Sequence, residues 1–179
     1  MSNQVLSTIR QRSSARAYSA QQLTQEELDT VIRAGLMAPT GMNRQPWHFT
    51  VIRSKEALER FGAARRAMPL PPGIPPEIAK KFGDPMRNAP VVILVSAKDG
   101  GTSFEDCCLA MENMFIAAAS LGIMSGWDHA IVRDLFSSDP ALKQAYIPDG
   151  YTLYAAAFFG YPGPNVRERG ERKGTVEYL

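Results

Sequence analysis

The residues best suited to chemistry near the start of the chain are two arginines and two serines within five positions: Arg12, Ser13, Ser14 and Arg16. A guanidinium offers a planar fork of N–H donors and a permanent positive charge, and a serine hydroxyl adds a further donor. A phosphate monoester is bound best by this combination of bidentate donors and compensating charge. The cluster therefore predicts a phosphate site. The alternative is a helix C-terminus whose cations complement the helix dipole.

A second polar segment, residues 38–49, joins a helix-like pattern to a strand-like pattern. Pro39 and Pro46 restrict its backbone, and Gly41 permits a close backbone approach. Amide and hydroxyl groups come from Thr40, Asn43 and Gln45. A loop this stiff loses little further entropy when a flat polar ligand docks on it. The same residue types also occur in purely structural connections, so the segment alone leaves both interpretations open.

Together, the two segments resemble the FMN-dependent nitroreductase family. The pattern Arg-x-Ser-x-Arg-x-Tyr begins at Arg12, and the more specific pattern Ala-Pro-x5-Gln-Pro-Trp-His-Phe begins at Ala38. Further matches follow in the expected order: Asp106, Ala110, Asn113, Met114, residues 121–122 and 125–127, and Gly160, Tyr161 and Pro162 with arginines after them. The resemblance covers nearly the whole chain, and the length is similar to that of the family's short-lidded branch.

The resemblance implies an α+β fold, a three-layer α/β/α sandwich whose central sheet is mostly antiparallel. It also implies an intertwined homodimer with two equivalent FMN sites at the interface. FMN would be tightly bound and NAD(P)H would be a transient co-substrate. Hydride would pass to flavin N5 and then, in a ping-pong cycle, to a small-molecule acceptor such as a nitroaromatic, quinone or enone. The chain has no Gly-x-Gly-x-x-Gly pattern for a separate dinucleotide domain, which agrees with nicotinamide binding over the flavin.

Site residues follow from the same resemblance. The N-terminal cluster occupies the family's phosphate and ribityl positions, and residues 39–45 match the loop placed against the flavin, typically from the partner subunit. The family presents backbone groups to the isoalloxazine ring at positions that correspond to Ser125, Gly126, Trp127, Asp128 and His129. Asp128 and His129 depart from the small or apolar residues expected there. His129 could protonate a product or act only as a spacer, and no side chain is assigned a catalytic role.

The basic C-terminal end contains a further candidate for the phosphate. Arg172 and Lys173 match positions that commonly reach it, although Arg167 and Arg169 fit equally well by spacing. A solvated basic tail is the alternative interpretation.

The elements that must position these groups alternate between helix and strand patterns. Thr24-x-x-Glu27 and Thr102-x-x-Glu105 are capping-box patterns that predict two helix starts. The second helix should bury positions spaced by three and four and end at Gly122: Phe104, Cys108, Met111, Phe115, Ala118 and Leu121. Residues 90–95 predict a central strand and residues 151–159 a last strand, with a shorter helix capped by Asp139 between them.

Residues 63–90 differ from the rest because prolines and cations crowd together there. One interpretation is a solvated surface excursion; the other, favoured by the resemblance, is a lid over the site that sets acceptor choice. On that view Arg65 and Arg66 would act on anionic acceptors or NADPH through a partly solvated field, with little effect on FMN.

Composition agrees with one compact domain spanning residues 1–179. The formal net charge of +2 is too small to predict nucleic acid as a partner. Adjacent Cys107 and Cys108 are not expected to pair, and the two histidines predict no metal site. With no long apolar stretch, we expect a cytoplasmic protein without a membrane partner. Two functional alternatives stay open: an FMN-binding module without turnover, and a dehalogenase or flavin-fragmenting relative on the same fold.

Overall fold

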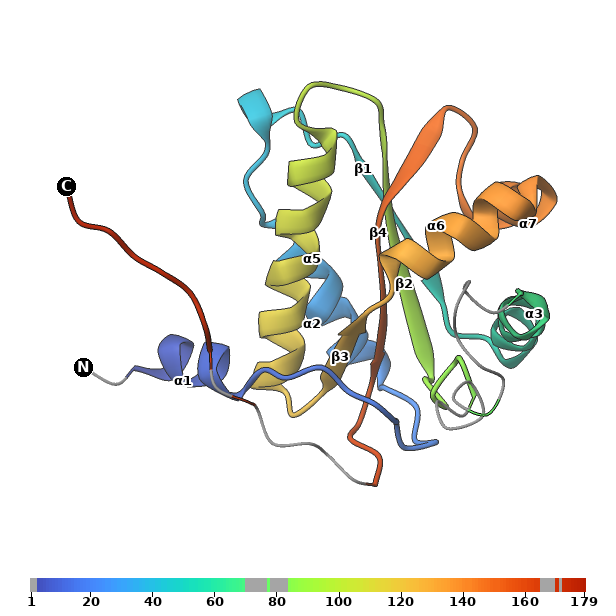
Figure 1. Cartoon of the computed structure of the whole chain (residues 1–179), viewed down its shortest axis with the longest axis horizontal. Coiled ribbons are helices and arrows are strands. Elements are labelled where there is room, and N and C mark those ends of the chain that lie inside the picture. The colour runs from blue at the N-terminus through green and yellow to red at the C-terminus, as the bar shows by residue number, and fades with distance from the viewer. Residues whose placement is uncertain (1–2, 70–76, 78–83, 165–169, 171) are drawn as a thin grey trace.

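Figure 1 shows the computed structural model of the chain, which describes residues 3–69, 77, 84–164, 170 and 172–179. The described helices are α1 (Gln4–Gln11), α2 (Gln25–Leu36), the 3-10 turn η1 (Gly41–Asn43), α3 (Lys55–Ala67), α5 (Ser103–Ser120), α6 (His129–Ser138) and α7 (Pro140–Tyr146). The strands are β1 (Trp47–Ile52), β2 (Val91–Lys98), β3 (Met124–Trp127) and β4 (Tyr151–Gly160).

The four strands form one antiparallel sheet in the order β1-β2-β4-β3. The predicted central strand is confirmed as β2, which pairs with β1 on one edge and β4 on the other. Alternate residues of β2 belong to different cores: Val92 and Leu94 to one, Ile93 and Val95 to the other. Burial on both faces explains why β2 is a continuous apolar run rather than an alternating one.

Helices cover both faces of this sheet, so the predicted three-layer α/β/α sandwich is confirmed. In Figure 1, α2 and α5 lie on one side of the sheet and α3, α6 and α7 on the other. The first core packs α3, α6 and α7 through Phe61, Phe136 and Leu142, among others. The second packs α2 and α5 through Val31 and Met111. Burying one such side chain contributes about 1.5–3 kcal/mol.

Local sequence signals fix several element ends as predicted. Thr24 and Glu27 form a reciprocal capping box at the start of α2. The Asp139 carboxylate accepts the Leu142 N–H at the start of α7. Gly122 follows α5 with a positive φ of 73°, a conformation that costs glycine little. The adjacent cysteines are both free, and burial raises the pKa of Cys107 to about 12.

The second predicted capping box is wrong. Thr102 makes no side-chain capping bond to α5; its hydroxyl instead donates to Asp106 Oδ2 at 3.0 Å. The predicted buried face is confirmed in its middle, where Met111, Phe115 and Ala118 are buried. It is wrong at both ends, because Phe104 is 50% exposed and Leu121 lies at the surface. The buried positions of α5 are Ser103, Asp106, Cys107, Ala110, Met111, Met114, Phe115 and Ala118.

The predicted excursion at residues 63–90 is shorter than expected at both ends. Residues 63–67 belong to α3, and Arg65 is only 5% exposed, so its assignment as a solvated lid charge is wrong. Met86 and Ala89 are buried in the first core just before β2. Residues 70–76 and 78–83 of the expected lid lie outside the described residues.

No described helix combines the length and apolar character needed to cross a membrane. Among the described residues, no cluster of three or more His, Cys, Asp or Glu side chains is placed to hold a metal ion.

Candidate functional site

The N-terminal arginine and serine cluster lies beside the edge strand β3. Helix α1 ends at Gln11, and Arg12 is its C-cap, donating its N–H to Thr8 O at 2.9 Å. The chain then runs parallel to β3. Ser14 forms an isolated β-bridge with Ser125, and the Ala15 N–H donates to Ser125 O at 2.9 Å. Backbone bonds from residues 15–19 to β3 and to the turn after β4 therefore fix the position of the cluster.

A cavity of about 270 Å³ opens between this segment and the C-terminal end of α5. Its lining comes from the end of α1 and the residue pair after it, from the segment that joins the last turn of α5 to β3, and from the turn after β4: Gln11, Arg12, Ser13, Ala119, Gly122, Ile123, Met124, Ser125 and Pro162. Arg12 and Ser13 are half-buried, whereas Ser14 and Arg16 are exposed. The structure thus brings part of the predicted phosphate cluster together with Ser125, in a cavity whose described lining residues include one cation, Arg12, and no acid.

The predicted loop, residues 39–45, lies at the opposite end of α5 (Figure 1). The Gly41 N–H donates to Asp106 Oδ1 at 3.0 Å, in the first turn of α5. Ala119, at the cavity, comes 13 positions later, and at about 1.5 Å per helical residue the two ends are about 20 Å apart. One chain therefore does not bring Asn43 and Gln45 to the cavity beside Arg12.

Gly126 lies where backbone and buried side chains crowd together. A Cβ added there would come within 2.9 Å of the Tyr18 hydroxyl oxygen. Tyr18 is buried and donates to Phe158 O at 3.3 Å. Because a larger residue would displace this ring, glycine keeps the β3 backbone close to residues 15–18.

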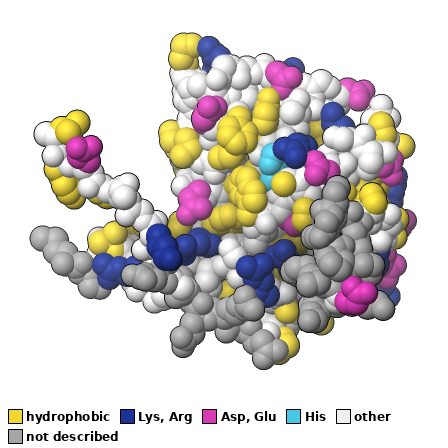
Figure 2. Space-filling view, viewed as in Figure 1, with side chains coloured by type: hydrophobic (Ala, Val, Ile, Leu, Met, Phe, Trp, Pro, Cys, Tyr) yellow, Lys and Arg dark blue, Asp and Glu magenta, His cyan; other side chains and the backbone are white. Residues whose placement is uncertain are grey.

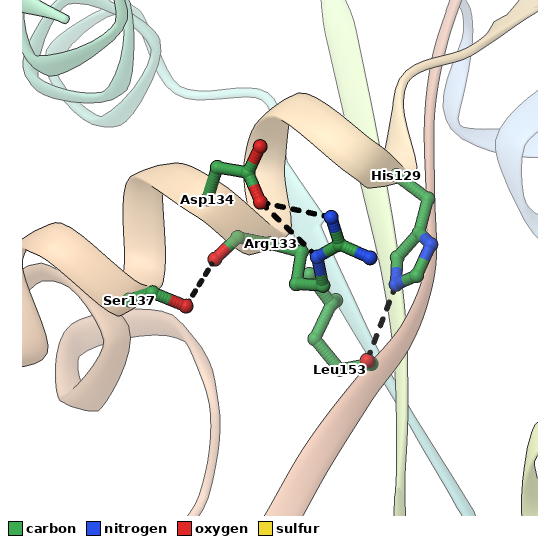
Figure 3. Close-up of polar contacts among 5 residues, drawn as sticks. All are labelled: His129, Arg133, Asp134, Ser137 and Leu153. Carbon is green, nitrogen blue, oxygen red and sulfur yellow. Dashed lines mark hydrogen bonds and ion pairs between the residues drawn. The ribbon is translucent and has the colours of Figure 1, made fainter.

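Trp127 and His129 form an aromatic pair at the end of β3. Their ring centroids are 5.9 Å apart in an edge-to-face arrangement, and Trp127 is 42% exposed. His129 Nε2 lies 3.3 Å from Leu153 O, and Figure 3 shows the Arg133 guanidinium between the imidazole and Asp134. A carbonyl oxygen only accepts, so Nε2 carries the proton of this bond. Burial lowers the pKa of His129, which makes the neutral ring the favoured form.

The Asp128 side chain points into the first core instead of toward the cavity. Asp128 Oδ2 lies 3.0 Å from Arg65 Nη2, and both side chains are almost fully buried. Burial raises the pKa of Asp128 to about 6, and nearby Arg65 and Arg87 offset this only in part. The carboxylate faces Arg65, and the Asp128 backbone is also occupied: its N–H donates to Ala156 O at 2.8 Å and its carbonyl oxygen accepts the Val132 N–H at 3.2 Å. The structure therefore does not support Asp128 as a ligand contact. Sequence reasoning missed the pair, although Arg65 follows Phe61 by four residues on the buried face of α3.

The last predicted site residue, Arg172, is exposed and lies in the extended segment 172–179. Figure 2 shows the C-terminal segment leaving the body of the molecule. Arg172 is not among the residues that line the cavity of its own chain. Arg167 and Arg169, the alternatives by spacing, lie outside the described residues.

Comparison with known proteins identifies the family of this chain. The family model for the Nitroreductase family matches residues 9–161. The chain belongs to this family. A protein of Archaeoglobus fulgidus with the provisional name NADH dehydrogenase/NAD(P)H nitroreductase is 30% identical over 164 residues, which cover 88% of this chain and 84% of that protein.

Solved structures of relatives share the fold. A nitroreductase from Bacteroides fragilis, crystallised with bound FMN, is 29% identical with a TM-score of 0.83, and the match covers 99% of this chain and 100% of that one. Iodotyrosine deiodinase bound to FMN and 3-iodo-L-tyrosine superposes with a TM-score of 0.73 at 20% identity, over 98% of each chain. The family fold therefore carries more than one kind of reaction.

The buried pair of this nitroreductase-family chain gives a testable pH dependence. A carboxyl whose pKa is raised on folding contributes stability that is present below its unfolded pKa and is lost as the pH rises through about 6. The free energy of unfolding, relative to that of Asp128→Asn, should therefore fall by up to about 3 kcal/mol between about pH 4 and pH 6. Urea titrations of both proteins across this range measure the difference.

Asp134→Asn is the matched control, because Asp134 lies on α6, the helix that Asp128 immediately precedes, but is largely exposed. Its difference from the parent should stay nearly flat over the same pH range. A parent that instead gains stability relative to Asp128→Asn as the pH rises would show that the pKa of Asp128 is lowered on folding.

Proposed function

We propose that this protein is an FMN-dependent oxidoreductase that uses NAD(P)H to reduce nitroaromatic, quinone or enone acceptors. The observation that carries the proposal is the cavity beside Arg12 and Ser13, which adjoins the edge strand β3 in a chain of the Nitroreductase family. The FMN-bound relative from Bacteroides fragilis, which matches over the full length of both chains, supports the choice of cofactor.

The residues that line the cavity fit the phosphate and ribityl end of FMN. The Arg12 guanidinium supplies charge and paired donors, and the Ser13 hydroxyl adds another donor. Ligand pockets usually enclose about 300–1,000 Å³, whereas this cavity measures about 270 Å³. It therefore suits part of a mononucleotide and leaves the ring to be covered by other residues.

When bound, FMN supplies the redox chemistry, accepting hydride at N5 from NAD(P)H and delivering electrons to the acceptor. The chain's own role is to bind and orient. As an edge strand, β3 has one row of backbone groups that the sheet does not pair. Ala15 uses the Ser125 carbonyl, and the remaining groups can face the ring. His129 is favoured as the neutral ring and is a poor proton source, so we assign protonation of the product to solvent.

We assign the second half of each site to another copy of this chain. Asn43 and Gln45 lie about 20 Å from the cavity of their own chain, as the length of α5 requires. Large apolar side chains are exposed on α1 and α5, including Val5, Phe104 and Leu109, and Figure 2 shows hydrophobic side chains gathered over the face that α5 presents. Tyr178, in the segment that leaves the body, is 94% exposed. A homodimer would bury these groups and place a loop against each cavity.

The function is tested by the colour of the purified protein. FMN-loaded protein should be yellow, should bleach anaerobically with NADH or NADPH, and should regain its colour when a nitroarene or quinone is added. Protein that holds no flavin after incubation with FMN and dialysis would overturn the proposal. Bleaching that no acceptor reverses would favour a binding module, and reversal by halophenols alone would favour a dehalogenase.

Replacing Arg12 tests the phosphate end of the site. Arg12→Ala should weaken FMN binding by about 2 kcal/mol, the scale of a charge-assisted hydrogen bond, which is roughly a 30-fold rise in Kd. Titration of the flavin-free protein with FMN, followed by flavin fluorescence, measures the change in Kd. Arg60→Ala is the control, because Arg60 is exposed on α3 across the sheet. An Arg12→Ala variant that binds FMN with the parent's affinity would show that Arg12 does not contact the phosphate.

Assembly and cofactor binding should be linked. If each FMN contacts two copies, added FMN stabilises the dimer, and dilution releases FMN. Thermal stability should therefore rise with FMN and with protein concentration. Sedimentation that shows a flavin-loaded monomer at micromolar concentration would contradict this arrangement.

A further inference from the structure

The loop at residues 40–45 holds an unusual backbone conformation. Met42, Asn43 and Gln45 all have positive φ, at 54°, 55° and 49°. Residues other than glycine rarely adopt this left-handed backbone region, because their Cβ crowds the neighbouring carbonyl oxygen. Met42 is 78% exposed, and Asn43 and Gln45 are also exposed, so burial of these side chains does not compensate for the strain. Such strain persists only where surrounding contacts over-determine the shape.

Most of the loop's hydrogen bonds lie within the loop itself. Thr40 Oγ1 accepts the Gln45 N–H at 3.1 Å, Thr40 O accepts the Asn43 N–H at 3.0 Å, and Gln45 Nε2 donates to Asn43 Oδ1 at 3.0 Å. These bonds fix the shape of the loop, but they do not fix its orientation relative to the rest of the protein. In the described part of the chain, the hydrogen bond that ties residues 40–45 to another element runs from the Gly41 N–H to Asp106.

Asp106 is well placed to act as an anchor. Its side chain lies in the first turn of α5 and the residue is 3% exposed. One carboxylate oxygen accepts the Gly41 N–H and the other accepts the Thr102 hydroxyl, both at 3.0 Å. A Cβ added to Gly41 would meet Thr102 Oγ1. The loop thus packs closely against the start of α5. One oxygen of the buried Asp106 carboxylate binds the loop, and the other binds Thr102, the residue that the loop contacts.

We propose that Asp106 is a positioning residue whose buried carboxylate holds residues 40–45 in the conformation that presents Asn43 and Gln45 to the flavin of the partner subunit. This inference rests on the proposed function, because it takes that loop as part of the flavin site. Asp106 does not touch the cofactor; it fixes the direction of side chains that do. A rigid loop needs no further ordering when the ligand arrives, so loss of the anchor weakens binding.

The competing explanation is that Asp106 only stabilises α5, since a negative charge in the first helical turn complements the helix dipole. Glu105 provides the matched control. It lies in the same first turn and carries the same charge, but it is exposed and does not bond the loop. Asp106→Asn provides the rescue, because its amide oxygen can still accept the Gly41 N–H while its NH₂ donates to the Thr102 hydroxyl oxygen.

Two measurements test the proposal: the Kd for FMN by fluorescence titration, and hydrogen exchange of amides 41–45 in protein freed of FMN. Asp106→Ala should raise Kd about tenfold and speed exchange at Gly41, the amide that loses its acceptor. Asp106→Asn should stay within about threefold of the parent Kd, and Glu105→Gln within about twofold. If Asp106→Ala does not fold, Thr102→Val, which removes one of the two bonds, should show the same changes at a smaller size.

An Asp106→Ala variant that loses thermal stability but keeps the parent's Kd and the parent's exchange at residues 41–45 would overturn the proposal. So would a Glu105→Gln variant with the same defects as Asp106→Ala, because charge alone would then explain them. Failure of the proposed function appears separately: the parent itself would bind no FMN, while exchange in the flavin-free protein would still report whether Asp106 anchors the loop.

Discussion

The length of α5 is the constraint on which the rest of the arrangement depends. Its apolar face lies on the sheet, so the helix cannot bend toward the site, and each end supports a different polar segment. The cavity beside Arg12 forms where the helix finishes, and the strained loop forms where it begins. A rigid helix of 18 residues therefore gives one chain two half-sites that face different regions of space. Under the function we propose, assembly becomes part of the chemistry, because neither half is sufficient alone.

Buried charge has a different role on the other face of the sheet. Arg65 Nη2 lies 3.0 Å from Asp128 Oδ2. Nevertheless, Arg65 Nε, Arg65 Nη1 and Asp128 Oδ2 make no well-aligned hydrogen bond among the described residues. Such pairs add little net stability, because desolvation offsets their attraction, but losing one partner strands the other charge. The pair fixes α3 against the point where β3 passes into α6. It thereby restricts the backbone of the strand that carries Gly126 and Trp127.

The sequence predicted those parts whose signals are local. The Thr24 capping box, the Asp139 cap and the apolar run of β2 each depend on residues within a few positions, and the structure confirms them. The Thr102 prediction failed because the same hydroxyl had a competing partner, Asp106, which was itself committed to a distant loop. Arg65 lies at the start of a stretch whose prolines and cations predict a partly solvated lid, and only the fold reveals its partner, 63 positions away. Strand β3 is too short and too rich in small residues for a periodic signal.

For the candidate site, residue chemistry indicated Arg12 and Ser13 because a phosphate suits their donors, and the structure places both in one cavity. Spacing could not show that residues 39–45 lie a helix length away, because that distance depends on which end of α5 each segment meets. Nor could it show that Asp128 turns its carboxylate into the core. These outcomes are set by tertiary packing, which overrides local preference.

The route of the chain at residues 12–19 has a consequence for folding. This segment pairs with β3 and with the turn after β4: the Ser19 N–H donates to Tyr161 O, and the Gly163 N–H donates to Ala17 O. These partners are more than a hundred residues apart in sequence. Contacts of such long range close large loops, whose entropy must be lost before the contacts form, so they tend to form late. The wall of the cavity is thus built from segments near both ends of the chain. Its backbone hydrogen bonds can form only after the residues that follow β4 have been synthesised.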